Sequence, residues 1–481
     1  MKQPGARDVS RGGGGSLRGR NRSVRLAALA SCVFLLVLGT SASAWGADAK
    51  GAHRLIFDID ATPSWTHEFH GVGSSTDGAE DVVLTKNGVA YVAGVVGTAA
   101  ATDLSLMKLV DGVPVWPAPK TYDSPYHSVD VATDVALGPG NTVYTAGMSI
   151  GANMMYDIIV VKWSSSGIVK WARRYDGPAH GHDQATSMVV DADGNVTVSG
   201  GSVNAGNTDW VMVSWSSSGA RRWVARMQAA GVHEVAPTSL ALAGDGSVYA
   251  TGLLASSPDV KAITVKYSPA GRKLWQKTYA GPSGGGAITF ASAARPGGGV
   301  FVGGMTLSPG TGSDGIVMSY TASGARDVFA LDIGPGGASE QRFNDLTVTS
   351  TGQVVAVGST TTGVNDDCRA VAYTTAGTIA AQATLPGAWR DAFEAVAADS
   401  FGGFYATGSY HTAVNKTAIV TVRGSVLTGG GGWTSLWAPA FISEENEPNA
   451  IAVSGSTAYV VGKCSEGPAF GTDQVVLGYV Y

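Results

Sequence analysis

The chain has 481 residues, of which 67 are glycine and 44% are hydrophobic, whereas only 14% are charged. Together with the absence of a sustained helical period, this composition excludes a disordered chain and is typical of a turn-rich, all-β protein. Residues 1–44 hold seven of the 32 basic residues and one of the 37 acidic residues, so the rest of the chain carries a formal charge of −11. An acidic surface repels phosphate groups, so we expect neither nucleic acid nor an anionic membrane as a partner.

The N-terminal segment differs from the rest of the chain. Its first 25 residues include seven lysines and arginines and one acidic residue. An apolar run covers residues 26–38, and small side chains follow at 42–44. This order predicts a secretory signal over residues 1–44 and a mature domain over residues 45–481. The alternative is an uncleaved membrane anchor, because the apolar run approaches the length that spans a bilayer. We expect a secreted, extracellular protein with no membrane span after signal cleavage.

A glycine follows a β-rich run at near-constant spacing through the mature chain. The spacing is 50 to 54 residues, and these anchor glycines are Gly94, Gly147, Gly200, Gly252, Gly304, Gly358, Gly408 and Gly462. A repeat of this length is one supersecondary unit that cannot bury its apolar face alone. The copies must therefore pack side by side.

The second copy shows the content of one repeat. Short β-rich runs cover residues 131–137, 142–147, 158–163 and 168–175, and turn residues separate them. This pattern predicts a four-stranded antiparallel blade. Six residues before the anchor, six copies have glycine and one has Asn141, which is typical of a hairpin position with a positive φ angle.

Aromatic residues recur at two positions of the repeat. The position three residues before the anchor is aromatic or β-branched in every copy, which indicates a strand whose aromatic side chains pack between neighbouring blades. Tryptophan recurs in the fourth strand, at Trp116, Trp171, Trp223 and Trp275. Its regular placement favours structural docking over a platform for a cofactor.

The two ends of the mature chain complement each other. Trp65 and Phe69 resemble the fourth strand of a copy that has no beginning, whereas the last copy, 449–481, has three strands. Pairing these ends closes a ring and removes exposed strand edges. We therefore predict an all-β fold, a β-propeller of four-stranded antiparallel blades, with eight blades, or seven if one copy is irregular. A whole repeat separates Cys368 from Cys464, so we expect both thiols to be unpaired.

Short motifs recur within the copies. They comprise a turn at 193–196, an aromatic-to-glycine run at 249–252, Asp157 and Asp183, the strand 160–164, and Trp171. These motifs resemble the SBBP-type β-propeller repeat of secreted bacterial proteins, and the resemblance covers residues 54–481. It implies a propeller scaffold and specifies no activity.

Acidic residues recur in the longer loops on one face of the predicted ring. One set, about seventeen residues before the anchors, comprises Asp77, Asp130, Asp183, Asp391 and Glu445. A second set, at the start of the third strand, comprises Asp103, Asp157, Asp209, Asp259, Asp314, Asp366 and Asp473. The first set predicts a carboxylate ring near the central channel that binds a ligand or a hard cation such as Ca²⁺. The alternative, which we favour, is that each aspartate caps its own turn.

Histidines gather in the loops that lead into the first four copies. Imidazole is a preferred ligand of zinc and copper, so His127, His182 and His233 form an alternative candidate metal site. The other interpretation is that these side chains are solvated in separate loops.

The chain contains no nucleophile elbow, no zinc-protease helix motif and no phosphate-binding loop. We therefore predict a monomeric, non-catalytic scaffold that binds an extracellular protein or polysaccharide through its long-loop face, with Ca²⁺ as the one candidate cofactor. The alternatives are a hydrolase or lyase that acts on carbohydrate and a quinoprotein-like dehydrogenase. Repeats with glycine and tryptophan also mark those dehydrogenases, but the vicinal cysteine pair typical of them is missing here.

Overall fold

The computed structural model describes residues 53–54, 57–59, 62–71, 76–98, 101–204, 207–228, 234–256, 259–308, 312–332, 340–363, 365–387, 389–413, 416–425, 432–437, 446–465 and 472–480. The chain divides into two compact units, residues 1–38 and 39–481, and every described residue belongs to the second unit. The predicted signal segment therefore lies outside the described residues. Within the described ranges, no helix has the length and apolar character needed to cross a membrane.

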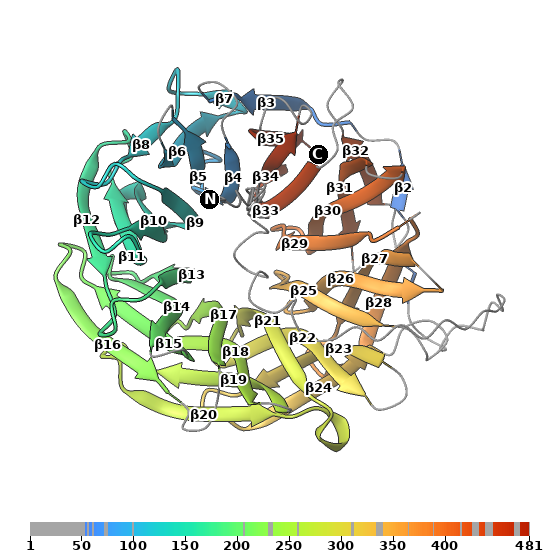
Figure 1. The fold of residues 1–481 in the computed structure, drawn as a ribbon. Helices are drawn as coiled ribbons and strands as arrows, with labels where there is room; N and C mark the ends of the chain where they lie inside the picture. The colour runs from blue at the N-terminus through green and yellow to red at the C-terminus, as the bar shows by residue number, and fades with distance from the viewer. Residues whose placement is uncertain are drawn as a thin grey trace, which may run out of the picture. The chain divides into compact units, whose positions relative to one another are not determined.

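The described strands of the second unit form seven hydrogen-bonded sheets, and the largest joins two four-stranded antiparallel groups through a parallel pairing of Thr208 with Glu234. Each antiparallel group, called a blade below, has an inner first strand and an outer fourth strand (Figure 1). The first strands are β4 (Gly78–Leu84), β9 (Asp130–Gly138), β13 (Asp183–Val190), β17 (Glu234–Leu242), β21 (Ala287–Ala294), β25 (Gln341–Val348), β29 (Ala392–Ala398) and β33 (Asn446–Ser454). The second strands, which carry the anchor glycines, are β5 (Ala90–Gly97), β10 (Thr142–Ile150), β14 (Val196–Asn204), β18 (Val248–Ser256), β22 (Val300–Ser308), β26 (Val354–Thr362), β30 (Gly403–Ala413) and β34 (Thr457–Ser465).

The outer half of each blade follows the same order. The third strands are β6 (Thr102–Val110), β11 (Tyr156–Trp163), β15 (Asn207–Trp215), β19 (Asp259–Tyr267), β23 (Gly312–Tyr320), β27 (Asn365–Tyr373), β31 (Lys416–Ser425) and β35 (Thr472–Val480). The fourth strands are β12 (Val169–Tyr175), β16 (Arg221–Met227), β20 (Lys273–Tyr279), β24 (Arg326–Asp332), β28 (Ile379–Leu385), β32 (Gly432–Trp437) and β3 (Trp65–Phe69). In the first blade the fourth strand is split into β7 (Val113–Pro114) and β8 (Lys120–Tyr122). Two 3₁₀ turns, η1 (Pro139–Asn141) and η2 (Pro282–Gly284), complete the described elements.

The first strands contact one another in a closed cycle, in the order β4, β9, β13, β17, β21, β25, β29, β33 and back to β4. Figure 1 shows them nearest the centre of this unit. The last blade is completed by β3, which pairs antiparallel with β35 and places Trp65 opposite Gly478. The predicted closure of the last blade by the N-terminal strand is therefore confirmed. Upstream, β1 (His53–Arg54) and β2 (Phe57–Ile59) pair parallel with β28 and β32.

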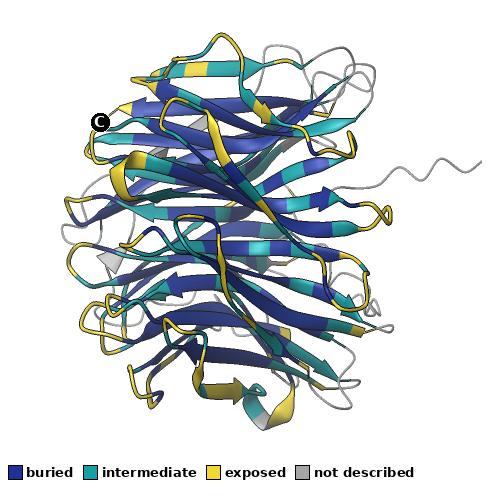
Figure 2. Cartoon of the chain, turned by 90° about the vertical axis from the view of Figure 1, so that its left-hand side faces the viewer, coloured by how far each residue is buried: buried dark blue, intermediate teal, exposed yellow. Residues whose placement is uncertain are grey.

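The hydrophobic core lies between the blades. Each core cluster contains residues from two neighbouring blades, and the cluster that joins the last blade to the first includes Tyr459, Val476, Val92 and Met107. Figure 2 shows the strands as largely buried, whereas the turns at their ends are exposed. Because each blade covers the apolar face of the next, a complete ring leaves no apolar face open.

The turns and the tryptophans behave as predicted. Asn141 has a positive φ of 56°, and the corresponding glycines also have positive φ angles. Trp171 Nε1 donates a hydrogen bond to the carbonyl oxygen of Ser217, in a turn of the next blade, at 3.1 Å. Trp223 and Trp275 make the equivalent bonds one and two blades further on. Structural docking of the tryptophans is therefore confirmed.

The predicted mature chain has two buried cysteines. Cys368 and Cys464 are not joined to each other by a disulfide bond, as predicted. Burial raises the pKa of the Cys368 thiol well above its ordinary value, so the thiol stays protonated.

Candidate functional site

The first-strand aspartates are buried and bind backbone groups of the loop before them. Asp77 accepts hydrogen bonds from the backbone N–H groups of Gly71 and Gly97, each at 2.7 Å. Asp183 accepts one from the backbone N–H of Gly177 at 2.5 Å. Each carboxylate thereby fixes the entry loop of its blade, which is the capping role that we favoured from the sequence.

The two other described members of this set make similar bonds. Asp130 accepts hydrogen bonds from the backbone N–H of Ser124 at 2.7 Å and from the Ser149 hydroxyl. Asp391 accepts bonds from the backbone N–H of His411 at 2.5 Å and from its Nδ1 at 3.0 Å. Glu445 lies outside the described residues. A carboxylate ring formed by this set stays a prediction.

The structure instead gathers carboxylates at two junctions between blades. Asp103, Asp123 and Asp130 form one triad, and Asp157, Asp176 and Asp183 form a second triad one blade further on. Within each triad, one oxygen from each of the three carboxylates lies within 4.8 Å of the others. Each triad combines a third-strand aspartate, a loop aspartate and the first-strand aspartate of the next blade. Asp130 and Asp183 therefore belong to separate clusters.

The two loops that complete the triads, 122–130 and 175–183, have the same residue spacing. Each contains a tyrosine, an aspartate next to it, a histidine four residues after that aspartate, and a final aspartate. His127 and His180 both adopt positive φ angles, 47° and 51°. Their backbone N–H groups donate to the carbonyl oxygens of Ser124 and Gly177, at 2.9 Å in each case. The same local sequence therefore builds the same turn in two neighbouring blades.

An imidazole and a carboxylate pair on the outer side of each loop. His127 Nδ1 lies 2.6 Å from an Asp123 carboxylate oxygen, and His180 Nδ1 lies 2.7 Å from Asp176. The hydrogen bond that His180 donates to Asp176 raises the pKa of His180, because the carboxylate stabilises the charged imidazolium. These pairs are exposed, whereas Asp130, Asp157 and Asp183 are buried and Asp103 is half-buried.

Burial of several carboxylates together raises their pKa values. Burial, with repulsion from Asp123 and Asp130, raises the pKa of Asp103 to about 6. Burial likewise raises the pKa values of Asp130, Asp157 and Asp183. The junctions therefore hold negative charge in places that favour a compensating cation.

The alternative histidine site is divided among separate contacts. His127 pairs with Asp123, whereas His182 Nδ1 accepts a hydrogen bond from the backbone N–H of Tyr156 at 3.2 Å. The His182 ring also packs against the Tyr156 ring, with 5.3 Å between centroids. His233 lies outside the described residues. Neither described histidine belongs to a triad, so a shared zinc or copper site stays a prediction.

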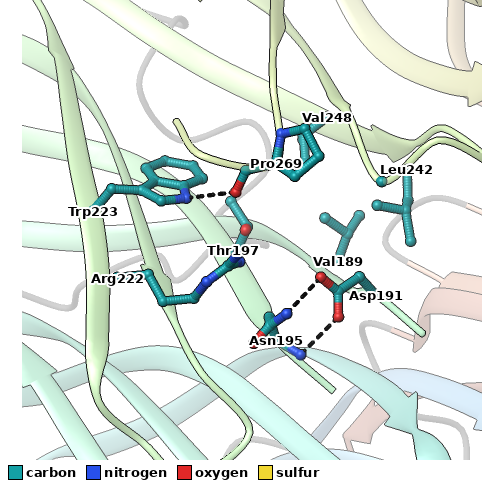
Figure 3. A pocket seen from close by; sticks show the side chains of 10 residues that line it. Val189, Asp191, Asn195, Thr197, Arg222, Trp223, Leu242, Val248 and Pro269 are labelled. Carbon is teal, nitrogen blue, oxygen red and sulfur yellow. Dashed lines mark hydrogen bonds between the residues drawn. The ribbon is translucent and has the colours of Figure 1, made fainter. Parts of the chain in front are cut away.

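Two hollows of the described surface lie away from the triads. One hollow between the third and fourth blades has a volume of about 10 Å³, room for one water at most. Figure 3 shows its lining: Asn195 donates two hydrogen bonds to Asp191, and Trp223 donates to the Pro269 carbonyl. A larger hollow, of about 240 Å³, is lined by β3 and by residues 114–119 of the split fourth strand. Its only titratable side chain is His67, so we do not assign the function there.

Sequence reasoning did not single out Asp123 and Asp176. Both stand in loops rich in other polar residues, and neither occupies one of the two recurrent acid positions. The signal that identifies them is the shared spacing of loops 122–130 and 175–183, which occurs in two copies only. Their closeness to Asp103 and Asp157 becomes visible only once the blades are packed.

Comparison with known proteins shows the fold. No family model matches the chain, and no curated protein is significantly similar to it in sequence. Among solved structures, Sqt1 from Chaetomium thermophilum bound to the N-terminus of ribosomal protein L10 is 12% identical with a TM-score of 0.52, over 86% of this chain and 98% of that one. A second structure of Sqt1 from Chaetomium thermophilum is 13% identical with a TM-score of 0.52, over 89% of this chain and all of that one.

A third structure, the polysaccharide lyase Uly1, has 10% identity and a TM-score of 0.46, over 87% of this chain and all of that one. The SBBP-type resemblance and secretion stay predictions. The strand order, the closed cycle of first strands and the similarity to Sqt1 together show that the chain has the β-propeller fold.

Proposed function

We propose that the chain is a secreted propeller scaffold that binds an extracellular protein or polysaccharide through the loop face of its first three blades. The main supporting observation is the repeated exposed pair on that face. The His127 and His180 side chains are 78% and 71% exposed, and each is fixed by its partner, Asp123 or Asp176. Polar side chains held on a rigid scaffold are available to a partner.

The loops that carry these pairs are held in place from below. Asp130 and Asp183 bind the start of their loops, and Asn153 Nδ2 donates to the carbonyl oxygen of His180 at 2.8 Å. A loop that is already ordered loses little conformational freedom when a partner binds. This arrangement favours recognition by a preformed surface.

The opposite face has a structural role in the same blades. Tyr144 Oη donates to the carbonyl oxygen of Gly194 at 2.9 Å, and Lys162 Nζ donates to that of Ser217 at 2.8 Å. These bonds join the tight turns of one blade to the strands of the previous blade. The loop face is therefore the better candidate for a partner surface.

The N-terminal sequence supports secretion. Its basic, apolar and small segments have the order of a signal peptide, and the remaining chain has a formal charge of −11. We propose eight blades, because the described strands form seven sheets and the largest comprises two four-stranded antiparallel groups. An acidic surface favours partners that carry positive charge.

The test begins with the full chain expressed in a bacterial host that secretes proteins. Mature protein in the medium, cleaved near residue 44, supports secretion, whereas full-length protein in the membrane fraction contradicts it. The secreted protein is then tested for binding to immobilised cell-wall polysaccharides and to basic extracellular proteins. We expect the double variant His127→Gln/His180→Gln to bind at least tenfold more weakly than the wild type.

The matched control is Lys170→Gln, which changes an exposed side chain near the tight-turn face and should leave binding unchanged. Absence of binding across the panel, or equal binding by the double variant, would overturn the proposal. Release of soluble oligosaccharides from the same polysaccharides would support the hydrolase or lyase alternative instead.

A further inference from the structure

The first triad has no basic partner for Asp103. In the described part of the chain, no lysine or arginine forms an ion pair with this carboxylate, which stands with Asp123 and Asp130. The exposed His127 pairs with Asp123 on the outer side. Arg174 reaches the Asp130 side of this junction: it donates to the Ser149 hydroxyl, which donates to Asp130, and its positive charge opposes the rise in the Asp130 pKa. Asp103 lacks the compensation that Asp130 receives.

The equivalent aspartates of the next two blades are compensated by arginine. Arg174 donates to Asp157 at 2.9 Å, and Arg226 donates to Asp209 at 2.9 Å. Both arginines stand on the fourth strand of their blade. Arg174 lies opposite Ile159, two residues after Asp157. Arg226 lies opposite Val211, two residues after Asp209. An arginine at this register position neutralises the third-strand carboxylate in these blades.

In the first blade the same register position holds threonine. Thr121 stands opposite Ser105, two residues after Asp103. The short hydroxyl side chain cannot supply the positive charge that Arg174 supplies one blade later. Asp103 thus lacks the arginine partner that its counterpart Asp157 has.

A buried hydroxyl group lies at the first triad without a well-formed hydrogen bond. Ser124 is fully buried, and its Oγ stands near enough to the Asp130 carboxylate to lower the pKa of that group, but the geometry of a hydrogen bond is not met. The residue follows Asp123 directly, and its backbone N–H donates to Asp130 at 2.7 Å. The hydroxyl therefore belongs to the turn that joins two members of the triad, where its oxygen is available as a ligand for a cation.

We propose that Asp103, Asp123 and Asp130 bind one hard divalent cation of the Ca²⁺ class. Ca²⁺ takes oxygen ligands at about 2.3–2.6 Å, so two of its ligands lie up to about 5 Å apart, and the triad oxygens fall within 4.8 Å of one another. Three carboxylates supply the charge, and the Ser124 hydroxyl or water completes the ligand set. The cation ties loop 122–130 to β6.

The proposal does not depend on partner binding. A cation that binds only the folded protein stabilises it by mass action, so the melting temperature should depend on Ca²⁺ concentration. The test uses the full chain, first stripped with a chelator and then titrated with CaCl₂ alone, with MgCl₂ as the comparison. Calorimetry measures stoichiometry and affinity, and thermal unfolding measures stabilisation.

We expect one Ca²⁺ per chain and a melting temperature that rises with Ca²⁺. Two variants should weaken Ca²⁺ binding at least tenfold: Asp103→Asn, which removes one negative charge from the triad, and Thr121→Arg, which adds the guanidinium present at Arg174. Thr121→Arg keeps all three carboxylates, so its loss of binding cannot come from a missing ligand. The control Asp193→Asn removes the same charge from an exposed turn and should bind Ca²⁺ like the wild type.

Absence of Ca²⁺ binding to the stripped wild type at millimolar concentration would overturn the proposal. Unchanged Ca²⁺ binding in both triad variants would also overturn it, as would an equal loss in the control. If Asp103→Asn does not fold, Thr121→Arg decides the outcome, because Thr121 is exposed and its replacement leaves the core intact.

Discussion

The carbonyl oxygen of Val131 faces Gly147 so closely that a Cβ atom on this glycine would lie 1.9 Å from it. Beside this contact the register of β9 and β10 shifts by one residue, a β-bulge. The other anchor glycines meet a first-strand carbonyl oxygen in the same way, at 1.9–2.2 Å from the position of a Cβ. Close approach of the backbone at the bulge, and not an unusual φ angle, explains why glycine recurs with the repeat.

Replacement of an anchor glycine should therefore destabilise the fold. Gly147→Ala forces a methyl group into the Val131 carbonyl, and we expect a loss of about 2–3 kcal/mol in the free energy of unfolding, as for other overpacked sites. Denaturant unfolding measures the loss. The matched control is Gly244→Ala, because a Cβ at Gly244 meets no atom within 4 Å. Equal stability of the two variants would show that the close approach of the Val131 carbonyl does not require glycine at position 147.

Carboxylates between first strands should also stabilise the ring. Asp134 accepts a hydrogen bond from the backbone N–H of Met188 in the next blade at 2.7 Å, and Asp81 makes the same contact with Val135 at 2.9 Å. Asp134→Ala leaves a buried N–H without this acceptor, which costs about 1–3 kcal/mol. Chemical denaturation of this variant beside Asp193→Ala, which changes an exposed turn, measures the difference. A loss no larger than that of the control would refute this role.

Closure of the ring should depend on Trp65. Its ring packs against Tyr459 with 5.0 Å between centroids, and it occupies the space next to Gly112 and Gly478. Trp65→Ala removes this contact between the N-terminal strand and the last blade, and we expect a loss of about 3 kcal/mol, as for large-to-small changes in a core. Thermal unfolding measures it. Trp389→Ala, at a residue that is 47% exposed, is the control and should change little.

Stability should fall as the pH rises through neutrality because of Glu394. Burial raises the pKa of this carboxyl group from 4.5 to about 7, and the nearby Arg342 opposes the rise. A carboxyl group whose pKa is higher in the folded state contributes stability that is fully present below the unfolded pKa and is lost as the pH rises through the folded pKa. The melting temperature of the wild type should therefore fall relative to Glu394→Gln between about pH 5 and about pH 8. A difference that does not vary with pH would contradict this assignment.

The second triad should gain Ca²⁺ binding when its arginine is removed. Arg174→Thr gives the second blade the residue found at Thr121 and frees the carboxylate of Asp157, whose Oδ1 is buried without a partner. We expect calorimetry to show a second equivalent of Ca²⁺ in this variant. A single equivalent, with the affinity of the wild type, would mean that Arg174 does not exclude the cation.

Much of the fold follows from local sequence. Turn glycines, strand-length apolar runs and the position of Trp171 each report on a contact within one repeat or with its neighbour. The end strand containing Trp65 was recognisable because it matches the fourth strand of complete copies. The split fourth strand of the first blade, around Trp116, was not predicted, since its prolines interrupt pairing that the repeat otherwise maintains.

The candidate site was predicted only in part. Asp130 and Asp183 recur with the repeat and were singled out, and their capping bonds follow from local geometry. Asp123 and Asp176 were missed, because their role depends on which third-strand aspartate packs beside them. The distance between the loop aspartate and the third-strand aspartate is set by the contact between blades, and a periodic sequence does not give that contact residue by residue.

The cation site of the first triad is tested most directly by a crystal structure of the full chain grown with Mn²⁺, a divalent cation that scatters anomalously and also takes oxygen ligands. We expect one strong anomalous peak among the carboxylates of Asp103, Asp123 and Asp130, and none in the second triad, where Arg174 pairs with Asp157. No peak at the first triad, or peaks of equal height at both triads, would contradict a cation site specific to the first triad.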